Sequence, residues 1–256
     1  MKKLYEKNEI TFSIIWIVAY VVLFSIADSI SLELGTAKLI TAPLCILLSV
    51  FLLIWVKKNN LMKKYGLCKF EGNIKKYLFF LPLVIIASTN LWNGVTLNLS
   101  VLETVLYVIS MIGVGFLEEL IFRGFLFRAM CKDNVRTAII VSSITFGIGH
   151  IVNLLNGAEF LSTILQVCYA VAIGFAFTAI VYYGKSLIPC IICHMVVNSL
   201  SVFAVKAGNT LNIITAIVLI VVSAGYALWI VKSEISTTSL AGGLLCGYKP
   251  LFPACL

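Results

Sequence analysis

Charged residues are scarce in this sequence. Aspartate, glutamate, lysine and arginine together make up 12% of the 256 residues, and 61% of the residues are apolar. Soluble domains carry about 25% charged residues, and a chain of this size buries only about three-quarters of its surface on folding. A soluble fold would therefore leave too much apolar surface in water. The composition excludes an ordinary soluble domain and predicts residence in a membrane.

A basic face is also absent, although the formal net charge is +8. The lysines and arginines lie in short gaps between apolar runs, and none of these gaps combines them with the aromatic or helical readers that nucleic-acid binding requires. Cations placed in this way report membrane topology. We therefore expect membrane lipids, and no nucleic acid, among the partners.

The eight cysteines do not suggest a disulfide framework. Six of them are scattered through or beside apolar segments, where a free cysteine behaves as a small hydrophobic residue. Cys246 and Cys255 could close a loop near the carboxyl terminus, but a tail on the cytoplasmic side would lie in a reducing compartment.

Eight apolar segments approach the length of about 20 residues that a helix needs to cross a bilayer. The short gaps between them leave no room for a soluble domain. We therefore predict an all-α, polytopic membrane protein with about eight transmembrane helices, forming one integral membrane domain over residues 1–235. Residues 236–256 form a Gly- and Pro-containing tail for which the sequence suggests no role. The predicted spans are residues 11–30, 39–56, 77–95, 104–128, 137–155, 161–183, 187–205 and 210–231.

The positions of the cations predict the orientation. If the amino terminus is cytoplasmic, sixteen of the nineteen lysines and arginines fall on the inner side, seven of them in residues 57–76, and only Lys38 and Lys206 fall outside. This asymmetry predicts that both termini are cytoplasmic. The apolar run from Thr11 to Ala27 is longer than the roughly 7–15 residues of a signal-peptide core, so we expect an uncleaved anchor helix.

Three charged residues interrupt the fourth predicted span, in the stretch GFLEELIFRG. A charge at the bilayer centre costs about 2.5–3.5 kcal/mol, so other interactions must offset the charges of Glu118, Glu119 and Arg123. Glu119 and Arg123 are four residues apart and share a helix face, which predicts an ion pair that could serve only to lock helices together. Glu118 points about 100° away and has no counter-charge on its own helix. That isolation suits a general base or a metal ligand.

Only two histidines occur in the chain, and both fall within predicted spans that follow the charged one. His194 shares a helix face with Asn198 in HMVVN, and His150 follows Phe146 by one turn in FGIGH. The glycines of that second stretch would let another helix approach closely. Polar side chains in the spans beside a buried carboxylate indicate one intramembrane site.

A second interpretation of the later histidine is open. Cys190, Cys193 and His194 match the CxxCH pattern of covalent haem attachment, and the same side chains could hold zinc. Haem attachment needs an exposed extracytoplasmic segment, whereas this stretch lies within a predicted span. A catalytic histidine is therefore the favoured interpretation.

These segments resemble the signature of the CAAX-protease and bacteriocin-processing (CPBP/Abi) family of intramembrane proteases. That signature reads EExxxR, FxxxH and HxxxN on successive motif helices. The corresponding residues here are Glu118, Glu119 and Arg123, then Phe146 and His150, and finally His194 and Asn198. The resemblance covers roughly residues 100–200.

The resemblance implies a membrane-embedded endopeptidase that acts on a peptide or a membrane-associated protein. By that likeness, Glu118 activates a water molecule with help from His150, and His194 and Asn198 stabilise the oxyanion of the tetrahedral intermediate. The second glutamate and the arginine of the EExxxR motif would position the site.

The same likeness leaves the cofactor open. Zinc held by Glu118, His150 and His194 is one implied mechanism, in which the metal lowers the pKa of its bound water. A metal-free glutamate mechanism uses the same residues. The sequence lacks an HExxH helix and does not choose between the two.

The resemblance implies three biological settings for the activity: peptide maturation, self-immunity to bacteriocins, and cleavage of prenylated CAAX proteins. The alternative is a non-catalytic membrane protein that binds a peptide or a partner. A small transporter is disfavoured, because the two halves of the chain show none of the self-similarity expected of inverted repeats.

Overall fold

The computed structural model describes the backbone of residues 1–240 and the side chains of residues 1–235. Most of the predicted tail, from residue 241 onward, lies outside the described residues. The described part is helical and contains no strand. Its α-helices are α1 Lys2–Lys7, α2 Glu9–Glu33, α3 Thr41–Lys58, α4 Leu81–Ser88, α5 Val101–Glu119, α6 Arg128–Met130, α7 Val135–Gly149, α8 Val152–Leu155, α9 Phe160–Gly184, α10 Ile188–Leu200 and α11 Asn209–Leu240.

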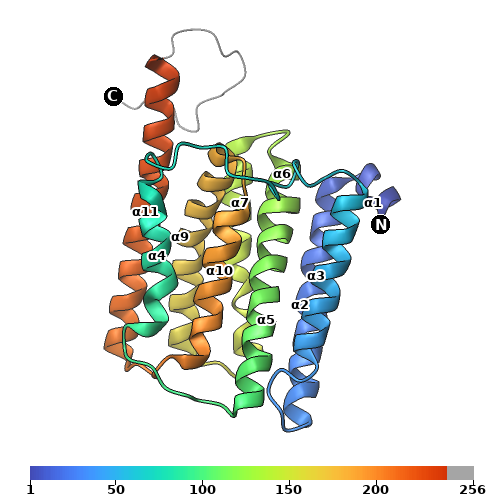
Figure 1. Ribbon diagram of the computed structural model, residues 1–256, viewed down its shortest axis with the longest axis vertical. Coiled ribbons are helices and arrows are strands. Elements are labelled where there is room, and N and C mark those ends of the chain that lie inside the picture. Colours follow the sequence, from blue (N-terminus) through green and yellow to red (C-terminus); the bar gives the residue numbers. More distant parts are fainter. Residues whose placement is uncertain (241–256) are drawn as a thin grey trace.

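The long helices run side by side as one bundle (Figure 1). The hairpin of α2 and α3 forms one edge, α4 and α11 form the other, and α5 and α10 lie between them. Residue 1 and the end of α11 lie at the same end of the bundle, as an even number of crossings requires. Which end faces the cytoplasm stays a prediction.

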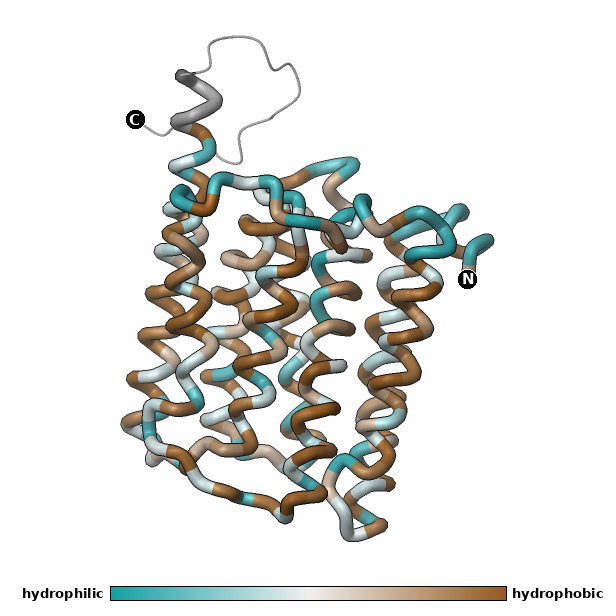
Figure 2. The backbone as a smooth tube through the Cα atoms, viewed as in Figure 1, coloured by the Kyte–Doolittle hydropathy of each residue, from teal (hydrophilic) through white to brown (hydrophobic). Residues whose placement is uncertain are grey.

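Six helices of the described part are long and apolar enough to cross a membrane. Their outer faces are apolar, with Ile14, Val18 and Val22 of α2 each about half exposed. Figure 2 shows apolar residues along the helices and polar residues gathered at the end of the bundle that carries the amino terminus. Exposed apolar surface over the length of a bundle is what lipid would cover. The fold is that of an integral membrane protein.

The predicted count of eight spans is not confirmed. The predicted spans 77–95 and 187–205 form shorter apolar helical stretches, Leu78–Leu91 and Ile188–Phe203, of between 10 and 17 residues. At 1.5 Å per residue these rise about 15–25 Å, less than the roughly 30 Å hydrocarbon core. The first of them begins with Phe79 and Phe80 in the left-handed region, at φ of 52° and 60°, which interrupts the regular helix before α4.

Helices α5 and α10 pack closely against each other at the centre of the bundle. A Cβ atom added to Gly115 would lie 2.7 Å from the backbone nitrogen of Met195 and 2.9 Å from its Cα. Backbone atoms cannot yield as a flexible side chain can, so only glycine allows this spacing. The predicted close approach at FGIGH is likewise confirmed at Gly147, where an added Cβ would lie 2.3 Å from Val171 of α9; at Gly149 it would meet nothing within 4 Å.

We expect Gly115→Ala to destabilise the protein by about 1–3 kcal/mol, because the added methyl group forces α5 away from α10. Thermal unfolding in detergent measures the change. Gly225→Ala is the matched control, since a Cβ at Gly225 of α11 meets nothing within 4 Å. Equal unfolding temperatures for the two variants would contradict this account of the helix contact.

Candidate active site

The EExxxR motif lies where α5 passes into a π-helical stretch, Leu120–Phe127. Helical segments of this wider form are rare and often occur at functional sites. Arg123 Nη1 donates to Glu119 Oε1 at 2.9 Å, and both side chains are fully buried. The ion pair predicted from the four-residue spacing is therefore present.

Two aromatic rings face the guanidinium of Arg123. The centre of the guanidinium lies 3.9 Å from the centroid of the Phe146 ring and 5.6 Å from that of Phe177. Cation–π contacts of this kind favour a cation that has lost its water. The phenylalanine of the FxxxH motif thus packs its ring against the guanidinium of the EExxxR motif.

The carboxylate of Glu119 also contacts the imidazole of His194. Its Oε1 lies 2.9 Å from His194 Nδ1, and the side chain of His194 is only 7% exposed. The guanidinium of Arg123 donates to the same oxygen, which therefore accepts from both neighbours, and the hydrogen-bond network assigns the proton of this contact to Nδ1. The other ring nitrogen, Nε2, then points to the neighbouring carboxylate.

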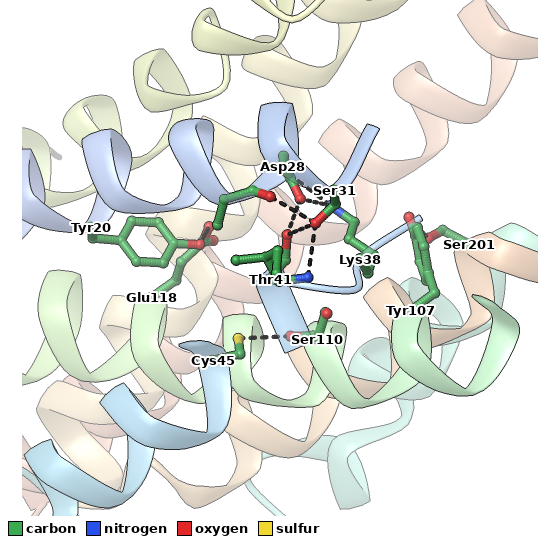
Figure 3. A network of polar contacts seen from close by, with 12 residues as sticks. Tyr20, Asp28, Ser31, Lys38, Thr41, Cys45, Tyr107, Ser110, Glu118 and Ser201 are labelled. Carbon is green, nitrogen blue, oxygen red and sulfur yellow. Dashed lines mark hydrogen bonds and ion pairs between the residues drawn. The ribbon is translucent and has the colours of Figure 1, made fainter. Parts of the chain in front are cut away.

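Glu118 is the carboxylate that faces this nitrogen. Its Oε2 lies 3.5 Å from His194 Nε2, which is too long for a well-formed hydrogen bond. Its Oε1 accepts a hydrogen bond of 2.7 Å from the phenol of Tyr20 in α2 (Figure 3). Glu118 has no counter-charge on its own helix, as expected, but the sequence reasoning missed this partner from another helix.

His150 and Asn198 are the remaining residues of the predicted site. His150 lies just beyond the end of α7, and its ring is 5.3 Å from that of Phe146, which in turn is 5.7 Å from the ring of His194. A cavity of about 490 Å³ is lined by Glu118, His150, His194 and Asn198. The structure therefore brings these four residues to one cavity, with Glu119 and Arg123 buried behind them.

The zinc site implied by the resemblance stays a prediction. Within the described residues, no three histidine, cysteine, aspartate or glutamate side chains are grouped so that they could hold a metal ion. A zinc ion needs its ligand atoms at about 2.0–2.3 Å. In this structure His194 Nδ1 contacts Glu119, and Nε2 lies 3.5 Å from Glu118 Oε2.

The two cysteines of the CxxCH pattern lie in the core of the bundle. Cys190 and Cys193 are buried, and their thiols face the backbone carbonyls of Phe177 and Leu83. Each contact satisfies a thiol within the protein core. The two cysteines act as small core residues, which agrees with the favoured interpretation of His194.

Fold and site together define a class: an α-helical integral membrane protein with a buried pair of glutamates, an arginine and two histidines around one cavity. Residues 100–200 match a family model described as Rce1-like, type II CAAX prenyl endopeptidase Rce1-like. This match confirms the resemblance to the CAAX-protease family and indicates an intramembrane protease with a peptide substrate. The searches of curated proteins and of solved structures found no match to the chain.

Proposed function

We propose that the protein is an endopeptidase that hydrolyses a peptide bond inside the membrane with water activated by Glu118. The observation that carries the proposal is the carboxylate of Glu118 beside His194 Nε2, at the wall of a cavity within the helix bundle. A buried carboxylate costs free energy, and one that lines a cavity is in place to act on a substrate there.

The chemistry needs one water molecule and one proton acceptor. Glu118 takes a proton from water, the oxygen attacks the scissile carbonyl carbon, and a tetrahedral oxyanion forms. The carbon–nitrogen bond then breaks, and the amine leaves with the proton that the site accepted. The products are a new carboxylate and a new amine.

The neighbouring residues have separate tasks in this proposal. His194, with Nδ1 held by Glu119, takes that proton from Glu118 at Nε2, donates a hydrogen bond from Nε2 to the oxyanion, and then passes the proton to the leaving amine. Asn198 supplies a second donor from the next turn of α10, and His150, which also lines the cavity, assists from the end of α7. The Arg123 guanidinium holds the carboxylate of Glu119 in place as the acceptor that orients His194.

The substrate class that fits best is a prenylated peptide with a CAAX ending, because the matched family model carries that description. Apolar residues such as Phe24, Ile86 and Met111 line the cavity together with the polar set. An apolar wall beside a hydrolytic group suits a substrate that has both a lipid chain and a peptide bond. Peptide maturation and bacteriocin self-immunity remain proposed settings for the same chemistry.

The test uses purified protein in lipid vesicles with a farnesylated peptide that ends in a CAAX sequence. We expect release of the last three residues, detected by mass spectrometry, and little release from the same peptide without the farnesyl group. A parallel sample with a chelator reports whether the activity needs a metal. Binding of the peptide without cleavage, retained in a Glu118→Gln/His150→Ala double variant, would reject the hydrolytic proposal in favour of a binding protein.

A further inference from the structure

The hydrogen-bond partner of Glu118 comes from outside the segment that matches the family. Tyr20 lies in α2, 98 residues before Glu118, whereas the match covers residues 100–200. Its phenol donates to Oε1 at 2.7 Å, and Figure 3 shows the ring directed at the carboxylate. The amino-terminal hairpin therefore contributes a side chain to the site.

Both ends of α2 are tied to other parts of the protein. At the amino-terminal end, Glu9 Oε1 accepts from Lys64 at 2.7 Å and from Lys132 at 2.8 Å. At the other end, Lys38 pairs with Asp28 at 2.8 Å (Figure 3). Tyr20 lies between these two anchors, so its phenol is held at a fixed height along the bundle.

The hairpin is also packed tightly on the helix that carries Glu118. A Cβ atom added to Gly113 of α5 would lie 2.6 Å from Cys45 Sγ of α3. The same thiol donates to the carbonyl of Ser110 at 3.1 Å. These contacts place the hairpin of α2 and α3 against α5 independently of the hydrogen bond between Tyr20 and Glu118.

We propose that Tyr20 is a positioning residue of the hydrolytic site. Its O–H bond to Oε1 fixes the rotation of the Glu118 carboxylate, so that Oε2 is the oxygen presented to His194. This inference rests on the proposed function, because it assigns Oε2 as the atom that accepts the proton from water. Without the phenol, the carboxylate samples other rotations, and fewer molecules present Oε2 correctly at any moment.

The predicted effect falls on turnover and not on substrate binding. Hydrogen bonds to charged groups contribute enough free energy for a loss of about 10- to 100-fold in kcat on Tyr20→Phe. KM should stay within about twofold of its original value, because the proposed role of the Tyr20 hydroxyl is to hold Glu118 and not to bind the substrate. A residue with only a structural role would not separate kcat from KM in this way.

The experiment compares Tyr20→Phe with Tyr226→Phe in the vesicle assay with the farnesylated peptide. Tyr226 of α11 does not line the cavity, and its phenol donates to the carbonyl of Tyr77 at 2.8 Å, so its variant removes the same atom and one hydrogen bond away from the site. We expect a fall in kcat for Tyr20→Phe alone, with both variants present in the membrane at the original amount and with unchanged unfolding temperatures. Equal kcat values for the two variants, or a higher KM with unchanged kcat for Tyr20→Phe, would overturn the assignment.

The wild-type protein and Glu118→Gln separate this result from a failure of the proposed function. If wild type cleaves and Glu118→Gln does not, an unaffected Tyr20→Phe variant rejects only the positioning role. If wild type does not cleave the peptide, the hydrolytic function and the role of Tyr20 are rejected together.

Discussion

Glu118→Gln should lower the cleavage rate by about 10²- to 10⁴-fold, the range that general-base catalysis contributes. The glutamine amide has nearly the shape of the carboxylate and its oxygen can still accept the hydrogen bond from Tyr20, but it cannot take a proton from water. The loss should therefore appear in the rate while the protein remains folded. Cleavage of the farnesylated peptide, together with the amount of protein in the membrane, measures both.

Glu33→Gln is the matched control for this change. Glu33 ends α2, and its residue is exposed. It undergoes the same chemical substitution at a residue that does not line the cavity, so we expect the original rate. Cleavage by Glu118→Gln at the rate of this control would show that Glu118 is not the base.

Arg123→Met should cause the largest loss of stability, about 3–5 kcal/mol, because it leaves a buried carboxylate without its partner. Both Glu119 and Arg123 are fully buried, so water cannot replace the lost guanidinium. We expect a much lower unfolding temperature in detergent and less protein in the membrane. Arg136→Met, at the exposed start of α7, controls for loss of an arginine.

A double variant separates the contribution of the Glu119–Arg123 pair to stability from its contribution to activity. Glu119→Gln/Arg123→Met removes both charges, so much of the lost stability should return. Activity should not return, because His194 no longer has an ionised acceptor at Nδ1. A stable Arg123→Met variant, or an active double variant, would contradict this account of the pair.

Much of the fold could be predicted from hydropathy, because the lipid solvent selects apolar helices of a defined length. The predicted spans 104–128 and 161–183 correspond to Val101–Met130 and Phe160–Gly184. The two shorter helical stretches differ in length from the predicted spans because hydropathy reports apolar residues and not backbone conformation. The left-handed residues Phe79 and Phe80 are apolar, yet they interrupt the helix.

The site could be predicted where its contacts are local in sequence. The pair of Glu119 and Arg123 follows from the four-residue repeat of a helix, and the structure contains it. The contact between Tyr20 and Glu118 depends on how two distant helices pack. One signal was present, since a buried tyrosine hydroxyl within an apolar span needs a hydrogen-bond partner, but nothing in the sequence named that partner.

The most direct test of the central claim is a single turnover of the farnesylated peptide in H₂¹⁸O that contains hydroxylamine. If Glu118 activates water for direct attack, the new carboxylate of the product carries ¹⁸O, no hydroxamate forms, and Glu118→Gln gives no labelled product. A hydroxamate would reveal a covalent acyl-enzyme, and an intact peptide would mean that the site does not hydrolyse it. Either result would contradict hydrolysis by a water molecule activated at Glu118.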